Sequence, residues 1–405
     1  MAAFVFYAKV EGYSEGTQKR MFRASKAVRE ANLAMSNTTE SFTVGVEEEY
    51  QIINRKTREL HSRQERILNG AQDALGDEVT PELYLSQIEI GTPVCRNLSE
   101  VRAELMRLRR EVIASAEREG NRIAAAGTHP FSHWEDQQLT PKARYVGIAQ
   151  DYQQLAREQL IFGCHVHVGI RDREAAIQVM NRSRAWLAPM LALAANSPFW
   201  LGADTGYASF RTEIWRRWPM AGTPQVFRSR AEYDQLVEAL VKTESITDAT
   251  KIYWDARPSA RFETVEFRVT DVCMTVDEAV MIAGLARALA RECYAQAMRD
   301  EQVRHARPEL LRAAKWRAAR YGLDADLIDT EAERAVPAAE LIEKFLAFLR
   351  PALEENGEWD EISQLVRETL RRGTGATRQR EAYRRSGRLE DVIDLIVNET
   401  ATGTA

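Results

Sequence analysis

The sequence predicts an α+β fold in which an antiparallel sheet carries the functional residues and the C-terminal third is helical. Three observations support this prediction. Strand-like segments alternate irregularly with long helices. Several of the strands carry polar residues on one face only, as strands of an antiparallel sheet with one core-facing surface do. Beyond about residue 305 the chain is helical and strongly charged, so this part is expected to pack outside the sheet.

The individual elements follow from the spacing of apolar residues. Strands, in which side chains alternate between two faces, are predicted at 43–53, 79–90, 122–126, 160–170, 250–254 and 260–270. Helices, in which apolar residues recur at three and four, are predicted at 98–119, 173–195, 230–242 and 276–299, and then at 308–320, 337–350 and 360–371. The sequence contains no repeat and no low-complexity linker, so residues 41–405 are expected to form a single domain.

Length, charge and cysteine content indicate a soluble enzyme that acts on small metabolites. The 405 residues suffice for a large core, and a net charge of −5 argues against a nucleic-acid surface or a polybasic membrane anchor. No apolar run approaches the ~20 residues that span a bilayer. The four cysteines form no C-x-x-C pair, so neither a disulfide framework nor a zinc site is indicated, and a cytoplasmic location is expected.

Residues 1–40 differ from the rest of the chain and are predicted to be an N-terminal extension. The extension is either poorly ordered or the result of a misassigned start, because Met35 precedes the first convincing strand and is an alternative first residue. Residues 12–16 match the nucleophile-elbow pattern G-x-S-x-G. Such an elbow normally lies inside a large parallel sheet with Asp and His partners downstream, so we do not assign a nucleophile here.

The stretch from Val44 to Ile53 is predicted to be a strand that places two carboxylates side by side, an arrangement that costs electrostatic free energy. Glu47 and Glu49 project from one face, while Glu48 projects from the other. Two like charges side by side repel each other unless a cation or a bound substrate offsets them. The alternative is an edge strand that its charges keep soluble.

Three other strand-like segments also present polar side chains in apolar company. They carry Glu82 and Glu89, then His165 and His167, then Glu266 and Arg268. Each has a structural alternative: a helix cap or turn residue for Glu82, a hydrogen-bonded pair for the histidines, and an ion pair for Glu266. Taken together, carboxylates with one or two imidazoles make an oxygen-rich site that suits Mg²⁺ or Mn²⁺ better than Zn²⁺.

Nucleotide binding would depend on metal ions and arginines, because the familiar phosphate-binding motifs are missing. The sequence has no G-x-x-x-x-G-K-[ST], no G-x-G-x-x-G after a strand and no H-E-x-x-H. Arginine grips carboxylates and phosphates bidentately. The candidates are Arg211, Arg257, Arg261 and Arg268. A glycine-containing basic segment at 371–380 is a further phosphate-binding candidate, with a solvated helix connection as its alternative.

At these residues the chain resembles the carboxylate–amine ligase family, the type 2 glutamate–cysteine ligases. The resemblance runs from about residue 42 to the C-terminus. It rests on four motifs in order: Gly45-Val46-Glu47-Glu48-Glu49-Tyr50, Ser86-Gln87-Ile88-Glu89-Ile90-Gly91-Thr92-Pro93-Val94, Gly163-Cys164-His165-Val166-His167-Val168-Gly169, and Tyr253-Trp254-Asp255-Ala256-Arg257-Pro258 with Thr264-Val265-Glu266-Phe267-Arg268.

The resemblance implies a glutamine-synthetase-like fold, a curved antiparallel sheet that forms an active-site funnel with helices on its outer face. It also implies a reaction in which ATP phosphorylates the side-chain carboxylate of glutamate and the amine of cysteine attacks the acyl phosphate. Implied Mg²⁺ ligands are Glu47, Glu49, Glu82, Glu89, His165 and Glu266. Glu266 and Arg268 are the implied catalytic residues, with Arg268 on an ATP phosphate, and His167, Arg211, Arg257 and Arg261 are expected around the substrates.

The sequence is compatible with several alternatives. The same Glu and His residues could activate water in a metal-dependent amide hydrolase, or the chain could be a nucleotide-binding module without turnover. Loops 127–142 and 196–227 are expected either to wall the pocket or to serve as structural cover. The acceptor amine is not fixed by the family fold. A homodimer is the expected assembly.

Overall fold

The computed structural model describes residues 40–303 and 306–404. The predicted N-terminal extension and the motif at 12–16 lie outside the described residues, so both stay predictions. No helix within the described ranges is both long enough and apolar enough to cross a membrane.

A seven-stranded sheet organises the molecule, and its central strand is the stretch that carries Glu47 and Glu49. This strand, β1 (Val44–Asn54), pairs with β3 (Gln87–Gly91) on one side. On its other side it pairs with β5 (Gly163–Gly169) and then β4 (Asn121–Ala124). The sheet is completed by β2 (Val79–Pro81), β11 (Thr264–Asp271) and β10 (Ala256–Pro258). Every pair is antiparallel, which confirms the predicted mixed fold with an antiparallel sheet.

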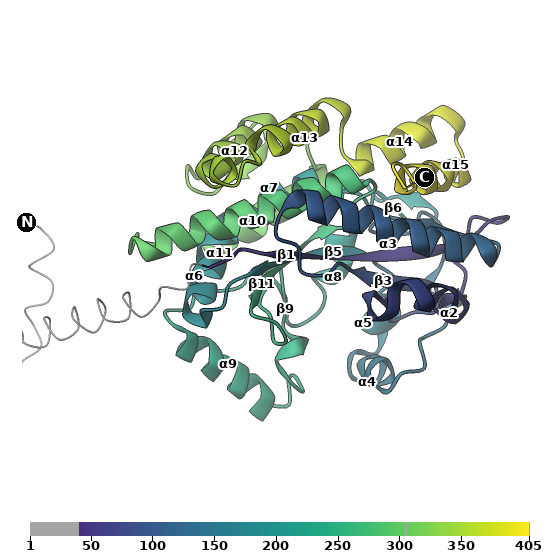
Figure 1. Cartoon of the computed structure of the whole chain (residues 1–405), viewed down its shortest axis with the longest axis horizontal. Helices are drawn as coiled ribbons and strands as arrows, with labels where there is room; N and C mark the ends of the chain where they lie inside the picture. The colour runs from purple at the N-terminus through teal and green to yellow at the C-terminus, as the bar shows by residue number, and fades with distance from the viewer. Residues whose placement is uncertain (1–39, 304–305, 405) are drawn as a thin grey trace, which may run out of the picture. The chain divides into compact units, whose positions relative to one another are not determined.

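Helices surround the sheet, and their bounds agree with most of the predicted ranges. They are α2 (Gln64–Leu75), α3 (Leu98–Arg118), α4 (Ala143–Tyr152), α5 (Gln154–Arg157), α6 (Arg173–Ser183), α7 (Leu187–Leu193), α8 (Phe210–Trp215), α9 (Arg230–Lys242), α10 (Val276–Met298), α11 (Pro308–Tyr321), α12 (Ala338–Glu355), α13 (Trp359–Arg372), α14 (Gly375–Ser386) and α15 (Leu389–Thr400). Figure 1 shows α3 and α10 between the sheet and the C-terminal helices α12 to α15. Because α10 is covered from both sides, nearly every residue from Val276 to Ala290 is buried.

Three predicted elements are interrupted. The strand predicted at 79–90 divides into β2 and β3, so Glu82 lies in the turn between them. The helix predicted at 173–195 is broken by a 3₁₀ turn at Arg184–Trp186, where Pro189 removes a backbone donor and crowds the preceding turn. The strand predicted at 250–254 is reduced to β9 (Tyr253–Trp254), which pairs with β8 (Ala221–Gly222) outside the main sheet.

Two further two-stranded sheets and the basic C-terminal segment complete the fold. The sheets are β6 (Phe199–Trp200) with β7 (Ala203–Asp204) and β12 (Leu327–Asp329) with β13 (Arg334–Val336). Only Gly373 and Thr374 separate α13 from α14, so the segment 371–380 is mainly helix. Its Arg378 is buried and paired with Glu278 and Glu399. The segment is therefore a connection between two helices, but it is packed rather than solvated as the alternative predicted, and phosphate binding by this segment stays a prediction.

The face of β1 opposite Glu47 and Glu49 carries a buried ion pair. Glu48 and Arg109 are both fully buried, and Arg109 Nη2 lies 2.5 Å from Glu48 Oε1. Tyr50 donates its hydroxyl to Glu48, and Arg109 also donates to the carbonyl oxygens of Cys273 and Met274. The pair thus fixes α3 to the central strand and to the segment that leads into α10. Glu48 therefore points away from Glu47 and Glu49, as predicted, and its carboxylate is paired with Arg109 and Tyr50.

Replacing Arg109 by Met should destabilise the protein by about 3–5 kcal/mol, because it leaves the Glu48 carboxylate buried without its partner. The double variant Glu48→Met with Arg109→Met should recover part of this loss, since neither charge remains. Chemical denaturation followed by circular dichroism measures both free energies of unfolding. Arg96→Ala removes an exposed arginine from an i,i+4 pair and serves as the control, with little change expected. Equal stability of wild type and Arg109→Met would contradict the prediction.

Candidate metal and substrate site

Two groups of acidic and histidine side chains lie on the same face of the sheet. The first, called the histidine cluster here, consists of Glu47, His167 and Glu266. The second, called the carboxylate cluster, consists of Glu49, Glu82 and Glu89. In each cluster one ligand atom per residue lies within 4.8 Å of the others, a spacing that a single cation can bridge. These are the only such clusters that residues 40–303 and 306–404 contain.

Strand register brings these residues together from distant parts of the sequence. Glu49 of β1 is directly opposite Glu89 of β3, and Glu266 of β11 is directly opposite His167 of β5. Glu47 faces His165 across the pair of β1 and β5. Side chains two residues apart on a strand share a face. Glu47 therefore belongs to the histidine cluster and Glu49 to the neighbouring carboxylate cluster, on the same face of β1. β1 therefore connects the two clusters.

The histidine cluster has opposite charges that keep its carboxylates ionised. Burial would raise the pKa of Glu47, but His165 and His167 outweigh it and hold this pKa well below its ordinary value. Likewise, burial would raise the pKa of Glu266, yet the neighbouring Arg268 and Arg257 hold it low. Glu47 Oε1 is 3.4 Å from His167 Nε2. The His167 ring is fixed from behind by a 2.9 Å contact between its Nδ1 and Thr264 Oγ1.

In the carboxylate cluster the neighbouring arginines do not outweigh burial. Burial raises the pKa of Glu49 and Glu89, and burial together with the nearby Glu49 raises the pKa of Glu82 to about 7. Each carboxylate receives one hydrogen bond, from Gly163 N to Glu49 (2.7 Å), from Leu83 N to Glu82 (2.6 Å) and from Thr80 Oγ1 to Glu89 (3.1 Å). Three carboxylates with most of their oxygen lone pairs free form a donor set that fits a hard divalent cation.

His165 lies between the two clusters, whereas His167 joins one of them. His165 Nδ1 is 3.2 Å from Glu47, and its Nε2 is 4.0 Å from Glu49. His167 was expected near substrate and His165 at the metal. The geometry instead places His167 with Glu47 and Glu266, while His165 borders both clusters and the adjoining cavity. Sequence alone could not separate the two histidines, because both point to the same face of β5.

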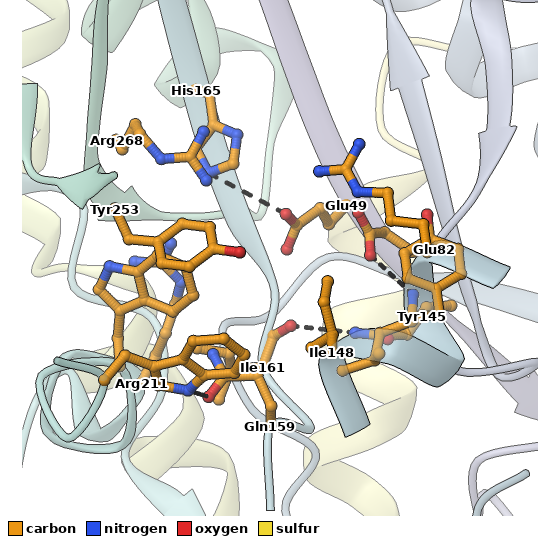
Figure 2. Close-up of a pocket in the computed structure, with 15 residues that line it drawn as sticks. Glu49, Glu82, Tyr145, Ile148, Gln159, Ile161, His165, Arg211, Tyr253 and Arg268 are labelled. Carbon is orange, nitrogen blue, oxygen red and sulfur yellow. Dashed lines mark hydrogen bonds and ion pairs between the residues drawn. The ribbon is translucent and has the colours of Figure 1, made fainter. Parts of the chain in front are cut away.

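A cavity adjoins the carboxylate cluster, and its two sides differ in chemistry. In Figure 2, Glu49 and Glu82 lie on one side, and Arg268, Tyr253 and Arg211 lie on the other. The remaining lining residues are Leu83, Gln87, Arg144, Tyr145, Ile148, Gln159, Ile161, His165, Trp215 and Trp218. Acidic oxygens thus face guanidinium groups and aromatic rings across the cavity.

The loop predicted at 196–227 contributes to this cavity, but the loop predicted at 127–142 does not. Arg211 and Trp215 come from α8, and Trp218 follows it. The loop at 127–142 serves as cover: Ser132 accepts a hydrogen bond from Leu60 N, and Thr140 donates to the carbonyl oxygen of Glu82. Arg144 and Gln159 also line the cavity and were not predicted, because they come from helix α4 and a connection without a polar-strand pattern.

The four predicted arginines occupy different positions. Arg268 pairs with Glu266 and lies beside Trp215, with Cζ 5.9 Å from the ring centroid. Arg257 is committed to structure, because it binds Glu266 at 2.9 Å and the carbonyl oxygens of Thr250 and Ile252. Arg261 lies outside the cavity, in a second pocket shared with Arg144 and Lys251. Arg211 lines the cavity with its guanidinium largely unpaired.

Comparison with known proteins agrees with this geometry. The family model described as glutamate-cysteine ligase family 2 matches residues 43–399. "Putative glutamate--cysteine ligase 2" of Herpetosiphon aurantiacus is 41% identical to this chain, over 89% of this chain and 94% of the relative. "Putative glutamate--cysteine ligase 2-2" of Frankia alni is 42% identical, over 90% of this chain and 99% of the relative.

The fold also matches solved structures. A glutamate–cysteine ligase from Francisella tularensis in complex with AMP superposes with a TM-score of 0.67 at 13% identity, covering 90% of this chain and 89% of that one. At this identity the likeness concerns the fold alone. The extent of the family match and the identity of the relatives together place the sequence: this chain belongs to glutamate–cysteine ligase family 2.

Proposed function

We propose that the protein is an ATP- and Mg²⁺-dependent carboxylate–amine ligase that joins glutamate to cysteine and releases ADP and phosphate. One observation supports this proposal above all. The histidine cluster and the carboxylate cluster, which β1 connects, lie beside a cavity that Arg211 and Arg268 line. Phosphoryl transfer needs charge neutralisation and positioning more than it needs a covalent nucleophile. The arginines and the proposed metal ligands of this site are suited to both tasks.

Each cluster would hold divalent metal, with Mn²⁺ as an alternative to Mg²⁺. The histidine cluster offers Glu47, His167 and Glu266, and the carboxylate cluster offers Glu49, Glu82 and Glu89. Bound cations would supply the positive charge that lets a triphosphate approach these carboxylates. Arg268 is held at the site by Glu266 and is suited to bind a phosphate of ATP.

The chain's own residues would orient the two reactants of the first step. The side-chain carboxylate of glutamate attacks the γ-phosphorus of ATP, the bond to the bridging oxygen breaks, and ADP leaves. Arg211 would bind a carboxylate of the amino acid, because its buried guanidinium lines the cavity with no hydrogen bond to the described residues. A charge-assisted bond to a carboxylate would satisfy it.

The second step needs an amine beside the acyl phosphate. The amine nitrogen attacks the acyl carbon, phosphate leaves, and the nitrogen loses a proton to a carboxylate or to solvent. Trp215, Trp218 and Tyr253 form an aromatic wall of the cavity, with Trp215 and Trp218 stacked at 5.8 Å between centroids. Such a wall suits an acceptor with a small apolar or polarisable side chain, which is consistent with cysteine.

An amine panel tests the proposal. Purified protein with ATP, Mg²⁺ and glutamate is expected to release phosphate only when a suitable amine is added, with cysteine the best of the panel. Chelating the metal with EDTA should stop the release. Turnover of amides without nucleotide would favour a metal-dependent hydrolase. Nucleotide binding by calorimetry with no phosphate release would favour a module without turnover. Either result would reject the ligase proposal.

The remaining expectations concern the setting of the enzyme. We propose that it acts in the cytoplasm, where ATP and free thiols are available, on small molecules rather than nucleic acid. A homodimer is the proposed assembly, and size-exclusion chromatography with light scattering tests it against a monomer.

A further inference from the structure

Arg211 is buried in a way that requires an explanation. Only 3% of its surface is exposed, and its sole charged neighbour within 4 Å among the described residues is Asp271, whose Oδ1 lies 3.9 Å from Nη1. That separation is too long for a hydrogen bond. Arg211 Nε has no hydrogen-bond partner in the structure either. A guanidinium in such a position has a desolvation cost that Coulomb attraction to Asp271, and to the more distant Glu49, offsets only in part.

Asp271 is held rigidly by groups other than Arg211. The residue ends β11 and is fully buried. Its Oδ2 accepts hydrogen bonds from Asn196 N at 2.8 Å and from Ser197 Oγ at 2.7 Å, and its Oδ1 accepts one from Ser209 Oγ at 2.7 Å. Three donors therefore fix the carboxylate, so its negative charge has a defined place beside Arg211.

The same network reaches the backbone of α8 and the C-terminal helices. Ser197 Oγ also accepts the backbone N–H of Arg211 at 3.1 Å, so the hydroxyl that holds Asp271 also holds the start of α8. Asn196, on the other side, accepts a hydrogen bond from the Gln379 side chain of α14 at 2.8 Å. The carboxylate is thus connected to α8, which lines the cavity, and to α14, which does not.

Two glycines leave the room that this pair occupies. A Cβ at Gly127 would lie 2.8 Å from Asp271 Cγ, and a Cβ at Gly163 would lie 2.4 Å from Arg211 Nη2. Side chains are excluded from both sides of the pair. The arrangement leaves the terminal nitrogens of Arg211 next to the cavity, and within residues 40–303 and 306–404 the nearest carboxylate oxygen is that of Asp271 at 3.9 Å.

We propose that Asp271 is a positioning residue that holds Arg211 for the carboxylate of an amino-acid substrate. Asp271 supplies the nearest counter-charge to the buried guanidinium, and the 3.9 Å separation leaves the N–H donors free for the ligand. Hydrogen bonds from Asn196 N, Ser197 Oγ and Ser209 Oγ hold the Asp271 carboxylate in place, so that it does not move within hydrogen-bond distance of Arg211. This inference rests on the proposed ligase function and assigns a part of its carboxylate recognition to a residue that does not touch substrate.

Steady-state kinetics of Asp271→Asn, varied in each substrate separately, tests the inference. The variant keeps the shape and loses the charge, so the KM of the substrate whose carboxylate binds Arg211 should rise at least about tenfold. The KM of ATP should stay within about twofold and kcat at saturation within about threefold. A rise confined to glutamate identifies its carboxylate as the ligand, and a rise confined to cysteine identifies that of the acceptor.

The matched control is Asp329→Asn, which removes a buried carboxylate from a pair with Lys344, between β12 and α12, where no residue lines the cavity. It should leave all three KM values unchanged. Ser197→Ala provides a milder variant that removes one hydrogen bond to Asp271 and should raise the same KM as Asp271→Asn by a smaller factor, even if Asp271→Asn does not fold.

Three results would overturn the inference: unchanged amino-acid KM values in Asp271→Asn, a parallel loss in all substrates, or an unchanged KM in Ser197→Ala. Failure of the ligase proposal is distinguishable, because in that case the wild-type protein itself releases no phosphate.

Discussion

Replacing Glu266 by Gln is expected to lower ligase turnover by at least about 100-fold while the protein stays folded. Glu266 is 2% exposed, belongs to the histidine cluster and pairs with both Arg257 and Arg268. Glutamine keeps the size and one acceptor oxygen but removes the charge that a cation and Arg268 both need. Loss of a single preorganised electrostatic contact in an active site costs about 10²–10³ in rate, and Glu266 takes part in more than one.

Phosphate release under saturating ATP, Mg²⁺, glutamate and cysteine measures this effect, with circular dichroism as the check on folding. Glu263→Gln is the matched control, because Glu263 lies in the same β10–β11 hairpin, is exposed and belongs to neither cluster. Calorimetry should also show weaker Mg²⁺ binding in Glu266→Gln than in the control. Full turnover in the Glu266 variant would reject the assignment of Glu266 to the site.

The sheet and much of the site could be predicted because alternation in a strand is a local property. Once Val44–Asn54 is a strand, Glu47 and Glu49 must share a face, and the same reasoning applies to Glu266 and Arg268. Glu48 shows the value of the argument. Its single-residue offset sends it to the opposite side, where Arg109, a residue 61 positions away, neutralises it.

The parts that could not be predicted depend on contacts between distant segments. Glu82 lies in a turn, and its place beside Glu49 depends on how that turn folds over the sheet. Arg257 and Arg268 look equivalent in sequence, yet Arg257 donates hydrogen bonds to the carbonyl oxygens of Thr250 and Ile252. Arg144, Gln159 and the supporting role of Asp271 depend on tertiary packing, for which a single sequence carries no periodic signal.

Gly163→Ala should lower kcat/KM for glutamate by about 100-fold or more without unfolding the protein. The added Cβ would lie 2.4 Å from Arg211 Nη2, 3.0 Å from Arg211 Cζ and 3.1 Å from His165 Nε2. The Arg211 guanidinium is the end of a flexible side chain, so it can move away and spare the backbone. A displacement of about 1 Å at such a group costs roughly 10²-fold in rate, because the reactants are no longer held in line.

Gly147→Ala is the matched control for this change. Gly147 lies in α4 and does not line the cavity, and a Cβ there would meet no atom within 4 Å, so activity should stay close to wild type. Kinetics of both variants, together with thermal denaturation, separate displacement of Arg211 from a general effect of an added methyl group. The KM of ATP should change less than that of glutamate in Gly163→Ala, because Arg268, the proposed phosphate ligand, is not among the atoms nearest to the added methyl group. Equal kinetics for the two alanine variants would show that the free guanidinium of Arg211 takes no part in binding substrate, and the proposed role of this cavity would then be wrong.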